Sequence, residues 1–410
     1  MADDRTFVIV GGGMAGAKAA ETLREEGFEG RVVIVGQEDD APYERPPLSK
    51  GYLLGEAARD DARVHEAGYY EEHDIELLQG TSVSRLLPGE HKIELAGGAT
   101  LGYDKLLLAT GAEPRRLDVE GANLDGVHVL RTYADSEALR AAFAPGARVV
   151  VIGGGWIGCE VAAAARHHGA EVTLLEAAPT PLYAVLGPEV GGFFGDVHRS
   201  HDVRLVTEAK LEAIEGDGRV SAVRLGGGER LECDIVVLGV GVAPRTALAE
   251  DAGIAIDNGV VVDELLRTSA ADVYAAGDVA NSLRPRYGRH VRVEHWANAL
   301  EQGPAAARSM LGGADPFDEL PYFFSDQYDV GMEYVGLHSP SDRVIVRRKP
   351  EEQQLVALWL GDGGRITAGM HVNDWDAIEP LKALVGAGEA IAADRLEDQD
   401  VPLAELAGQT

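Results

Sequence analysis

Two glycine-rich turns of the same type have the spacing needed to bind the pyrophosphate of a dinucleotide. The first has the sequence Phe7-Val-Ile-Val-Gly11-Gly-Gly13-Met-Ala-Gly16, and the second Val149-Val-Val-Ile-Gly153-Gly-Gly155-Trp-Ile-Gly158. In this motif the first glycine allows a tight turn, the second admits phosphates close to the backbone, and the third lets the helix pack on the strand. The N-terminus of that helix presents free N–H groups to the phosphates. Two such turns indicate two bound dinucleotides, the layout of an enzyme that passes electrons between them.

The strand expected after the second turn ends in a carboxylate, Glu176. A carboxylate at this position accepts hydrogen bonds from both ribose hydroxyls of NAD and repels the 2′-phosphate of NADP. The next residues are Ala177 and Ala178, so no arginine follows that could pair with a 2′-phosphate. The sequence therefore predicts NADH in preference to NADPH.

The elements that must position these turns are repeated along the chain. Residues 7–35 and 149–176 each have the pattern strand–helix–strand, and residues 101–111 and 231–241 each have the pattern of one buried strand that ends at a glycine. This duplicated alternation of strands and helices predicts two parallel sheets.

The last part of the chain follows a different pattern. A strand over 273–278 ends on Gly-Asp, and from about residue 320 strand-like runs such as 342–347 and 355–360 precede helical sequence from Ala377. We expect a smaller α+β domain there.

Composition limits the class of protein. The 410 residues are 45% hydrophobic and carry a formal net charge of −31, which opposes binding to nucleic acid. No apolar run reaches the roughly 18 residues that span a bilayer, and no signal-peptide pattern opens the chain. The two cysteines, Cys159 and Cys233, lie far apart, and no metal-ligand spacing is present. We expect a cytoplasmic protein without metal, membrane or nucleic-acid partner, as a monomer or weak homodimer.

One stretch opposes the acidic trend. Residues 284–292, Arg-Pro-Arg-Tyr-Gly-Arg-His-Val-Arg, contain four arginines and no acid. Such a stretch is either a solvated basic loop or a docking patch for an acidic partner.

The chain as a whole resembles the FAD-dependent pyridine-nucleotide reductases of the ferredoxin reductase type. The resemblance rests on stretches that run in family order over nearly the whole chain: Pro46-Pro-Leu-Ser-Lys50, Ala109-Thr-Gly111, Leu130-Arg-Thr132, Gly153-Gly-Gly-Trp-Ile-Gly-Cys-Glu160, Gly239-Val-Gly-Val-Ala-Pro244, Ala276-Gly-Asp278, Val293-Glu-His-Trp-Ala-Asn-Ala299 and Ser325-Asp-Gln-Tyr328. It implies an α/β fold with two Rossmann-like dinucleotide-binding domains, one inserted in the other, and a C-terminal α+β domain. The implied segments are 1–113 and 245–319 for the FAD domain, 114–244 for the NAD domain and 320–410 for the C-terminal domain.

The resemblance also implies which residues bind the cofactors. For FAD they are Gly11, Gly13, Ala15, Gly16, Gln37, Glu38, Arg45, Lys50, Val83, Ala109, Arg131, Asp278, Trp296 and Phe324. For NADH they are Gly153, Gly155, Ile157, Gly158, Glu160, Glu176 and Gly241. Lys50 and Glu160 are the implied catalytic pair: the lysine stabilises negative charge on reduced flavin, and the carboxylate holds the lysine.

Three positions depart from the family pattern. Gln37 stands where relatives have the acid that binds the FAD ribose, with Glu38 adjacent; Ala184 stands where many have an arginine near NADH; and Phe324 stands where tryptophan is common. The first two predict weaker contacts with the respective nucleotides.

The missing cysteines restrict the electron acceptor. A disulfide reductase needs a redox cysteine pair beside the flavin, and the segment 43–50 contains no cysteine. Flavin can release electrons singly, so the expected partner is an acidic iron–sulfur ferredoxin that serves a monooxygenase or dioxygenase. Two alternatives stay open: an NADH oxidoreductase with quinone, rubredoxin or dioxygen as acceptor, and an NADH-sensing flavoprotein like apoptosis-inducing factor.

Overall fold

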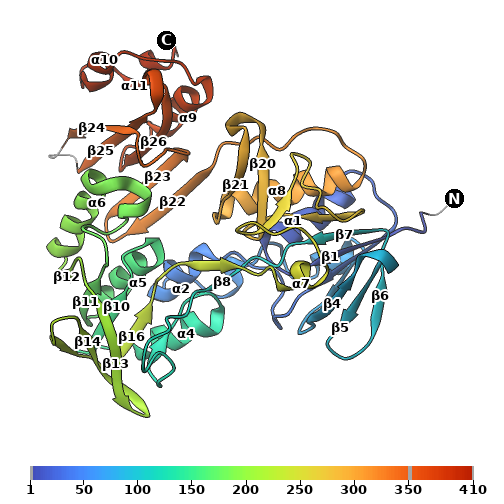
Figure 1. Cartoon of the computed structure of the whole chain (residues 1–410), viewed down its shortest axis with the longest axis horizontal. Helices are drawn as coiled ribbons and strands as arrows, with labels where there is room; N and C mark the ends of the chain where they lie inside the picture. Colours follow the sequence, from blue (N-terminus) through green and yellow to red (C-terminus); the bar gives the residue numbers. More distant parts are fainter. Residues whose placement is uncertain (1–2, 350–352, 409–410) are drawn as a thin grey trace. The chain divides into compact units, whose positions relative to one another are not determined.

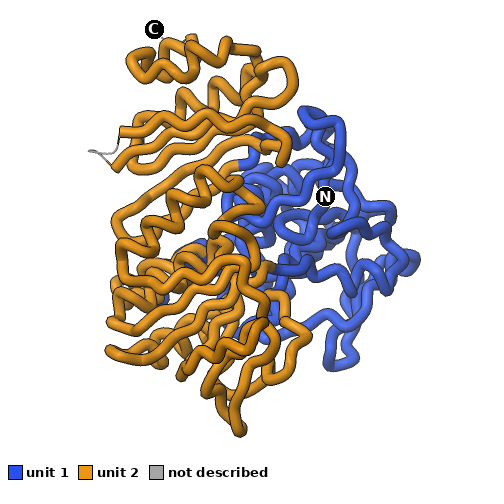
Figure 2. Tube along the Cα trace, turned by 60° about the vertical axis from the view of Figure 1, so that its left-hand side comes forward, with its two compact units in different colours: residues 1–45, 59–113, 242–321 blue, residues 46–58, 114–241, 322–410 orange. Residues whose placement is uncertain are grey.

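The computed structural model describes residues 3–349 and 353–408. Its chain forms two compact units (Figure 2). Unit 1 comprises Met1–Arg45, Arg59–Glu113 and Val242–Pro321, and unit 2 comprises Pro46–Ala58, Pro114–Gly241 and Tyr322–Thr410. The short stretch 46–58, which carries Lys50, thus groups with unit 2, which the sequence analysis did not anticipate. The three domain boundaries given above remain a prediction.

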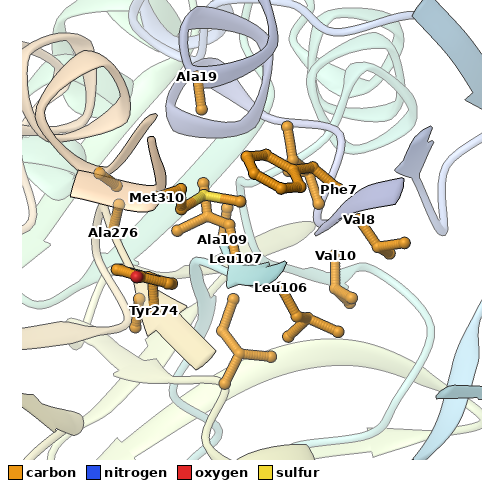
Figure 3. Close-up of a cluster of buried hydrophobic side chains, with 14 of the residues drawn as sticks. Phe7, Val8, Val10, Ala19, Leu106, Leu107, Ala109, Tyr274, Ala276 and Met310 are labelled. Carbon is orange, nitrogen blue, oxygen red and sulfur yellow. The ribbon is translucent and has the colours of Figure 1, made fainter. Parts of the chain in front are cut away.

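Unit 1 is built on a parallel sheet of five strands. In spatial order the strands are β19 (Val273–Ala275), β7 (Lys105–Leu108), β1 (Thr6–Val10), β2 (Arg31–Val35) and β3 (Ile75–Leu78). Figure 1 labels β1 and β7. Apolar side chains from several of these strands gather in the core, together with Met310 of a covering helix (Figure 3). Parallel strands buried on both faces have near-continuous apolar sequence, which is why Phe7–Val10 was recognisable as a strand.

Two helices of unit 1 pack closely beside the nucleotide turn. These are α1 (Met14–Glu25) and α8 (Trp296–Met310). A Cβ atom at Gly303 would lie 2.5 Å from the backbone oxygen of Ala15. Only glycine permits this approach, so α8 lies directly against the first turn of α1.

Unit 2 contains the second parallel sheet. Its strands, in spatial order, are β12 (Arg204–Val206), β11 (Glu171–Leu175), β10 (Arg148–Ile152), β16 (Ile235–Leu238) and β9 (Val127–His128). Helix α5 (Trp156–His167) follows β10, and α6 (Tyr183–Ser200) follows β11. The two predicted strand–helix–strand units and the α/β fold class are therefore confirmed.

The buried strand predicted to end at a glycine is present in each of residues 101–111 and 231–241, but each region also contains a second, shorter strand. The first region contains β6 (Thr100–Gly102) and β7, and the second contains β15 (Arg230–Glu232) and β16. In each pair the earlier strand belongs to a separate antiparallel sheet, β4-β5-β6 or β13-β14-β15, where β4 is Val83–Leu87, β5 is Lys92–Leu95, β13 is Leu211–Asp217 and β14 is Arg219–Leu225.

In both units an aspartate lies between the paired strands and bonds to the central strand of the parallel sheet. Asp104 accepts a hydrogen bond from the backbone N–H of Thr6 at 2.6 Å, and Asp234 accepts one from Arg148 N–H at 2.9 Å. An aspartate side chain thus caps the first residue of the central strand, β1 or β10. The duplication extends to this detail.

The C-terminal part of unit 2 is an antiparallel sheet with helices, as predicted. Its strand order is β22 (Tyr322–Gln327), β23 (Val330–Gly336), β26 (Ile366–Val372), β25 (Gln354–Leu360) and β24 (Arg343–Lys349). Helix α9 (Ile378–Ala387) packs on β26 and β23. Among the residues that the structure describes, no helix is long and apolar enough to cross a membrane.

A buried histidine joins α6 to β22 within unit 2. His198 is fully buried; its Nε2 lies 3.1 Å from Oε1 of Gln327, and its Nδ1 lies 3.1 Å from the hydroxyl oxygen of Tyr328. Burial lowers the pKa of His198 to about 4; the hydrogen bond to Gln327 opposes this shift, and the nearby His201 adds to it. His198 is therefore neutral in the native protein near pH 7.

This histidine makes stability depend on pH. The unfolded chain binds a proton at His198 below its ordinary pKa, whereas the native chain does so only below about pH 4. The free energy of unfolding should therefore fall by about 3 kcal/mol as pH falls from 6.5 to 4. Urea unfolding of the wild type and of His198→Gln at several pH values measures this. The variant should be less stable at pH 7.5 but lose less stability on acidification, and equal pH slopes would contradict the assignment.

Candidate active site

The first glycine turn leaves room for a ligand at the start of α1. Gly11 has a φ of +129°, and a Cβ there would lie 2.0 Å from the backbone oxygen of Ala109. Gly16 is equally constrained, since its Cβ would lie 2.1 Å from Gly11 O. Gly13, by contrast, is the N-cap of α1 without a side-chain cap, and a Cβ there would meet nothing within 4 Å. The first-turn N–H groups of α1, including that of Ala15, have no intrahelical acceptor, and groups of this kind can bind a pyrophosphate.

A negative charge at Gly13 should strongly weaken binding of the dinucleotide without harming the fold. The backbone of Gly13 is extended (φ −104°, ψ −169°), which suits an aspartate or asparagine N-cap. Gly13→Asp should weaken FAD binding at least about a hundredfold, because two charges about 4 Å apart at an effective dielectric of about 20 repel by about 4 kcal/mol. Gly13→Asn is the neutral control of equal size, and FAD titration of the apoprotein is the measurement. Equal affinities in the two variants would show that no phosphate lies at this turn.

The carboxylate after β2 is held by its own neighbours. Glu38 Oε1 accepts a hydrogen bond from Arg45 at 2.5 Å, and Oε2 accepts one from the hydroxyl of Tyr43 at 2.5 Å. Burial opposes the ionisation of Glu38, but the hydrogen bond and charge of Arg45, with the hydroxyl of Tyr43, outweigh it and hold the pKa of Glu38 below its ordinary value. Gln37 is exposed. Of these two residues, Glu38 is therefore the one whose side chain is held in place.

The other residues expected at FAD divide between the two units. Unit 1 contains Val83 at the start of β4, Ala109 after β7, Asp278 after β19, and Trp296 at the start of α8. Burial raises the pKa of Glu44, and the neighbouring Trp296 opposes the rise. Unit 2 contains Arg131, Lys50 and Phe324.

The second glycine turn repeats the geometry of the first. Gly153 has a φ of +103°, and a Cβ at Gly158 would lie 1.9 Å from Gly153 O. Gly155 is the N-cap of α5 without a side-chain cap. Ile157 in the first turn of α5 is 41% exposed, although large apolar side chains are usually buried. Gly241 has a φ of +89°.

Glu176 is fixed to this second turn. Its Oε2 accepts a hydrogen bond from the backbone N–H of Gly154 at 2.7 Å, and its Oε1 accepts one from Ala178 N–H at 2.7 Å. A carboxylate oxygen has further acceptor capacity after one bond, so both oxygens can still accept from ribose hydroxyls. Tyr183, beside the Ala184 departure, is 41% exposed on the first turn of α6.

The structure brings Lys50 and Glu160 together, 110 residues apart in sequence. Lys50 Nζ lies 2.8 Å from Glu160 Oε1, which also accepts from the hydroxyl of Ser325 at 2.6 Å, and Oε2 accepts from Ser49 at 2.5 Å. The side chain of Glu160 is 3% exposed and that of Lys50 16%. Lys50 Nζ also lies 5.4 Å from the ring centroid of Phe324. The buried carboxylate thus has one cationic and two neutral donors, which fix the lysine.

The segment that carries Lys50 is anchored to two helices of unit 2. It contains the 3₁₀ turn η1 (Pro46–Ser49) and the short helix α2 (Gly51–Leu54). Ser136 of α4 (Tyr133–Ala142) donates to the backbone oxygen of Leu48 at 2.8 Å, and His168 Nε2 lies 2.9 Å from Leu53 O. These contacts hold the lysine at the first turn of α5.

A cavity of about 490 Å³ with several charged side chains in its lining lies beside this ion pair. Lys50, Glu160, Arg166, His201 and Asp326 are among its lining residues. Burial raises the pKa of Asp326, the positive charge of Lys50 opposes the rise, and the negative charge of Glu160 adds to it. The cavity therefore places acidic and basic groups next to Lys50.

The basic stretch is not a patch of four exposed arginines. Arg284 is 1% exposed. Arg286 lies 3.8 Å from Asp318, and Arg292, whose side chain is 9% exposed, forms an ion pair with Glu294. Arg289 stays exposed. Burial and acidic neighbours thus remove most of the positive surface expected from the sequence, and the docking-patch interpretation is wrong for Arg284.

Comparison with known proteins identifies the family. Residues 5–303 match the family described as pyridine nucleotide-disulphide oxidoreductase, and residues 322–407 match the one described as reductase C-terminal. The chain belongs to the pyridine nucleotide-disulphide oxidoreductase family. It is an FAD-dependent oxidoreductase of pyridine nucleotides, and the resemblance stated from the sequence is confirmed.

Several relatives match along almost their entire length. The ferredoxin reductase subunit of 5,5′-dehydrodivanillate O-demethylase from a Sphingobium species is 41% identical over 402 residues, 97% of each chain. Putidaredoxin reductase of Pseudomonas putida is 36% identical over 405 residues, which cover 97% of this chain and 96% of the relative. A solved structure of the covalent putidaredoxin reductase–putidaredoxin complex matches with a TM-score of 0.94 at 36% identity, covering 99% of this chain and 98% of that chain.

Sequence analysis assigned no role to three polar residues that the structure places at the site. Ser49 and Ser325 both donate to Glu160, and Tyr43 donates to Glu38. Ser49 and Ser325 lie inside stretches that carried the family resemblance, adjacent to Lys50 and Phe324. That adjacency was the available signal.

Proposed function

We propose that this chain is an NADH-dependent ferredoxin reductase that supplies electrons to an oxygenase. The observation that carries the proposal is similarity over the whole chain, at 36–41% identity, to reductases that are named for this role. Both glycine turns and the Lys50–Glu160 pair support it. A cytoplasmic location and a monomeric or weakly dimeric state are part of the same proposal.

The two nucleotide sites have distinct tasks. We assign the first turn, with Gly13 and Ala15, to the FAD pyrophosphate. We assign the second turn to NADH, with Glu176 accepting hydrogen bonds from the ribose hydroxyls. Bound FAD supplies the chemistry that links them, because a flavin accepts a hydride and releases electrons singly. Lys50 supplies a positive charge that balances the negative charge gained on reduction, and Glu160 fixes Lys50 Nζ.

The thiols of this chain favour a one-electron acceptor over a disulfide. Both cysteines are free and buried. Cys159 Sγ lies 3.5 Å from Gly154 O, and burial, with the charges of Glu160 and Glu176, raises its pKa. Burial raises the pKa of Cys233 to about 12. Neither is a reactive thiolate near pH 7, so electrons leave by a route without cysteine chemistry.

Steady-state NADH oxidation with a panel of acceptors tests the proposal. The panel contains a [2Fe–2S] ferredoxin, a rubredoxin, a quinone and dioxygen. The expected result is the highest kcat/KM with a ferredoxin. A higher kcat/KM with quinone, rubredoxin or dioxygen would make that compound the acceptor instead of ferredoxin. Slow transfer to all four, with long-lived reduced flavin, would favour the NADH-sensing alternative.

A further inference from the structure

Arg284, at the end of β20 (Ala280–Arg284), places a guanidinium group in the interior of unit 1. The residue is 1% exposed and donates three hydrogen bonds, each to an uncharged acceptor. Nε donates to Ser282 Oγ at 2.9 Å, one terminal nitrogen to the backbone oxygen of Glu319 at 2.9 Å, and the other to Asn298 Oδ1 at 2.6 Å. The group also lies 4.2 Å from the ring centroid of Phe317. Burial of a cation without a hydrogen-bonded carboxylate is costly.

The hydrogen bonds continue from Arg284 to the backbone before Asp278. Ser282 Oγ accepts a second hydrogen bond, from Gln302 Nε2 at 3.2 Å, and its own proton points to Val291 O at 3.4 Å. Gln302, fully buried on α8, accepts through Oε1 from the backbone N–H of Gly277 at 2.8 Å. One side-chain network therefore joins the buried cation to Gly277.

Gly277 in turn lies against the nucleotide turn of unit 1. Its φ is +80°, and a Cβ there would lie 3.2 Å from Ala15 Cβ. Gly303, the residue after Gln302, makes the close approach to Ala15 O described above. The far end of the network is thus packed on the first turn of α1, where the pyrophosphate site lies.

We propose that Arg284 is a positioning residue for the dinucleotide of unit 1, which holds the Gly277–Asp278 backbone against the first turn of α1 through Ser282 and Gln302. Arg284 does this without touching the cofactor. A charged donor suits the task because its hydrogen bonds are stronger than neutral ones, and its positive charge in a low-dielectric interior favours a bound diphosphate. The proposal rests on the assignment of FAD to this turn.

FAD affinity and the stability of the apoprotein, measured separately, test this role. Arg284→Met removes the charge and the donors while retaining bulk, and Arg284→Lys retains the charge. Arg289→Met, at an exposed position of the adjoining strand β21 (Arg289–Arg292), is the matched control. FAD titration of each apoprotein should show a Kd raised about tenfold or more in Arg284→Met, partly restored in Arg284→Lys and unchanged in the control.

A second variant probes the network from its other end. Gln302→Met should also raise the Kd for FAD, and the double variant with Arg284→Met should be non-additive, because both substitutions interrupt one chain of contacts. If Arg284→Met does not fold, the Kd for FAD of Gln302→Met alone decides whether the network positions the nucleotide site. A lower Tm of the apoprotein with an unchanged Kd for FAD would overturn the proposal and leave Arg284 a stability residue. Ferredoxin is absent from these measurements, so failure of electron transfer to ferredoxin would contradict the proposed function and not this inference.

Discussion

We expect this enzyme to prefer NADH over NADPH and expect replacement of Glu176 to remove most of that preference. Like-charge repulsion of the 2′-phosphate and the loss of ribose hydrogen bonds together correspond to about 2–3 kcal/mol, or about 30- to 150-fold in kcat/KM. In Glu176→Ala the ratio of kcat/KM for the two nucleotides should approach unity. Steady-state reduction of ferricyanide with each nucleotide measures this ratio without involving a ferredoxin.

The structure supplies a matched control for this substitution. Because Glu176 also accepts hydrogen bonds from the N–H groups of Gly154 and Ala178, alanine removes support of the glycine turn as well as the charge. Glu176→Gln removes the charge and one of the two acceptor oxygens but retains the other, so it supports the turn better than alanine does. Its NADPH activity should rise while its NADH activity falls less than in Glu176→Ala. A wild-type ratio close to unity, or an unchanged ratio in both variants, would contradict the role assigned to Glu176.

Loss of Lys50 is expected to slow reduction of the flavin by NADH about 10- to 100-fold. A hydrogen bond to a charged group contributes about 1.5–3 kcal/mol, and Lys50→Met removes the cation that balances the negative charge of reduced flavin. The flavin midpoint potential should fall as well. Stopped-flow absorbance under anaerobic conditions gives the rate, and a redox titration gives the potential.

Stability measurements separate this role from a structural one. Lys50→Met leaves the carboxylate of Glu160, 3% exposed, with only the hydroxyls of Ser49 and Ser325 as donors. Breaking a buried pair in this way costs about 3–5 kcal/mol, whereas the double variant with Glu160→Gln should regain part of the lost stability. If flavin reduction and potential are those of the wild type in both single variants, the pair serves the fold alone.

The features of this fold that are local in sequence were predictable. Glycine spacing and apolar runs predicted β1, α1, β10 and α5, because a parallel strand buried on both faces has a continuous apolar sequence. The division of residues 101–111 and 231–241 into two strands was not predictable in this way. Asp104 and Asp234 lie between the two strands, and their carboxylates bond to the distant Thr6 and Arg148. Apolar periodicity does not report such contacts.

The candidate site shows the same limit. Glu176 was recognised from its position at the end of a strand, but the Lys50–Glu160 contact joins residues 110 apart and followed only from the family resemblance. The basic stretch was misread at Arg284, because a run of arginines in sequence gives no information on which guanidinium groups are buried. Charge composition predicts surface charge only where the charged side chains remain exposed in the folded protein.

The stoichiometry of electron transfer tests the central claim most directly. The holoenzyme is reduced anaerobically with one equivalent of NADH and mixed with an excess of oxidised [2Fe–2S] ferredoxin, while flavin and iron–sulfur absorbance are recorded together. The proposed function predicts two reduced ferredoxins for each NADH and return of the flavin to its oxidised spectrum at a rate that matches turnover. Flavin that stays reduced in the presence of every ferredoxin tried would contradict it.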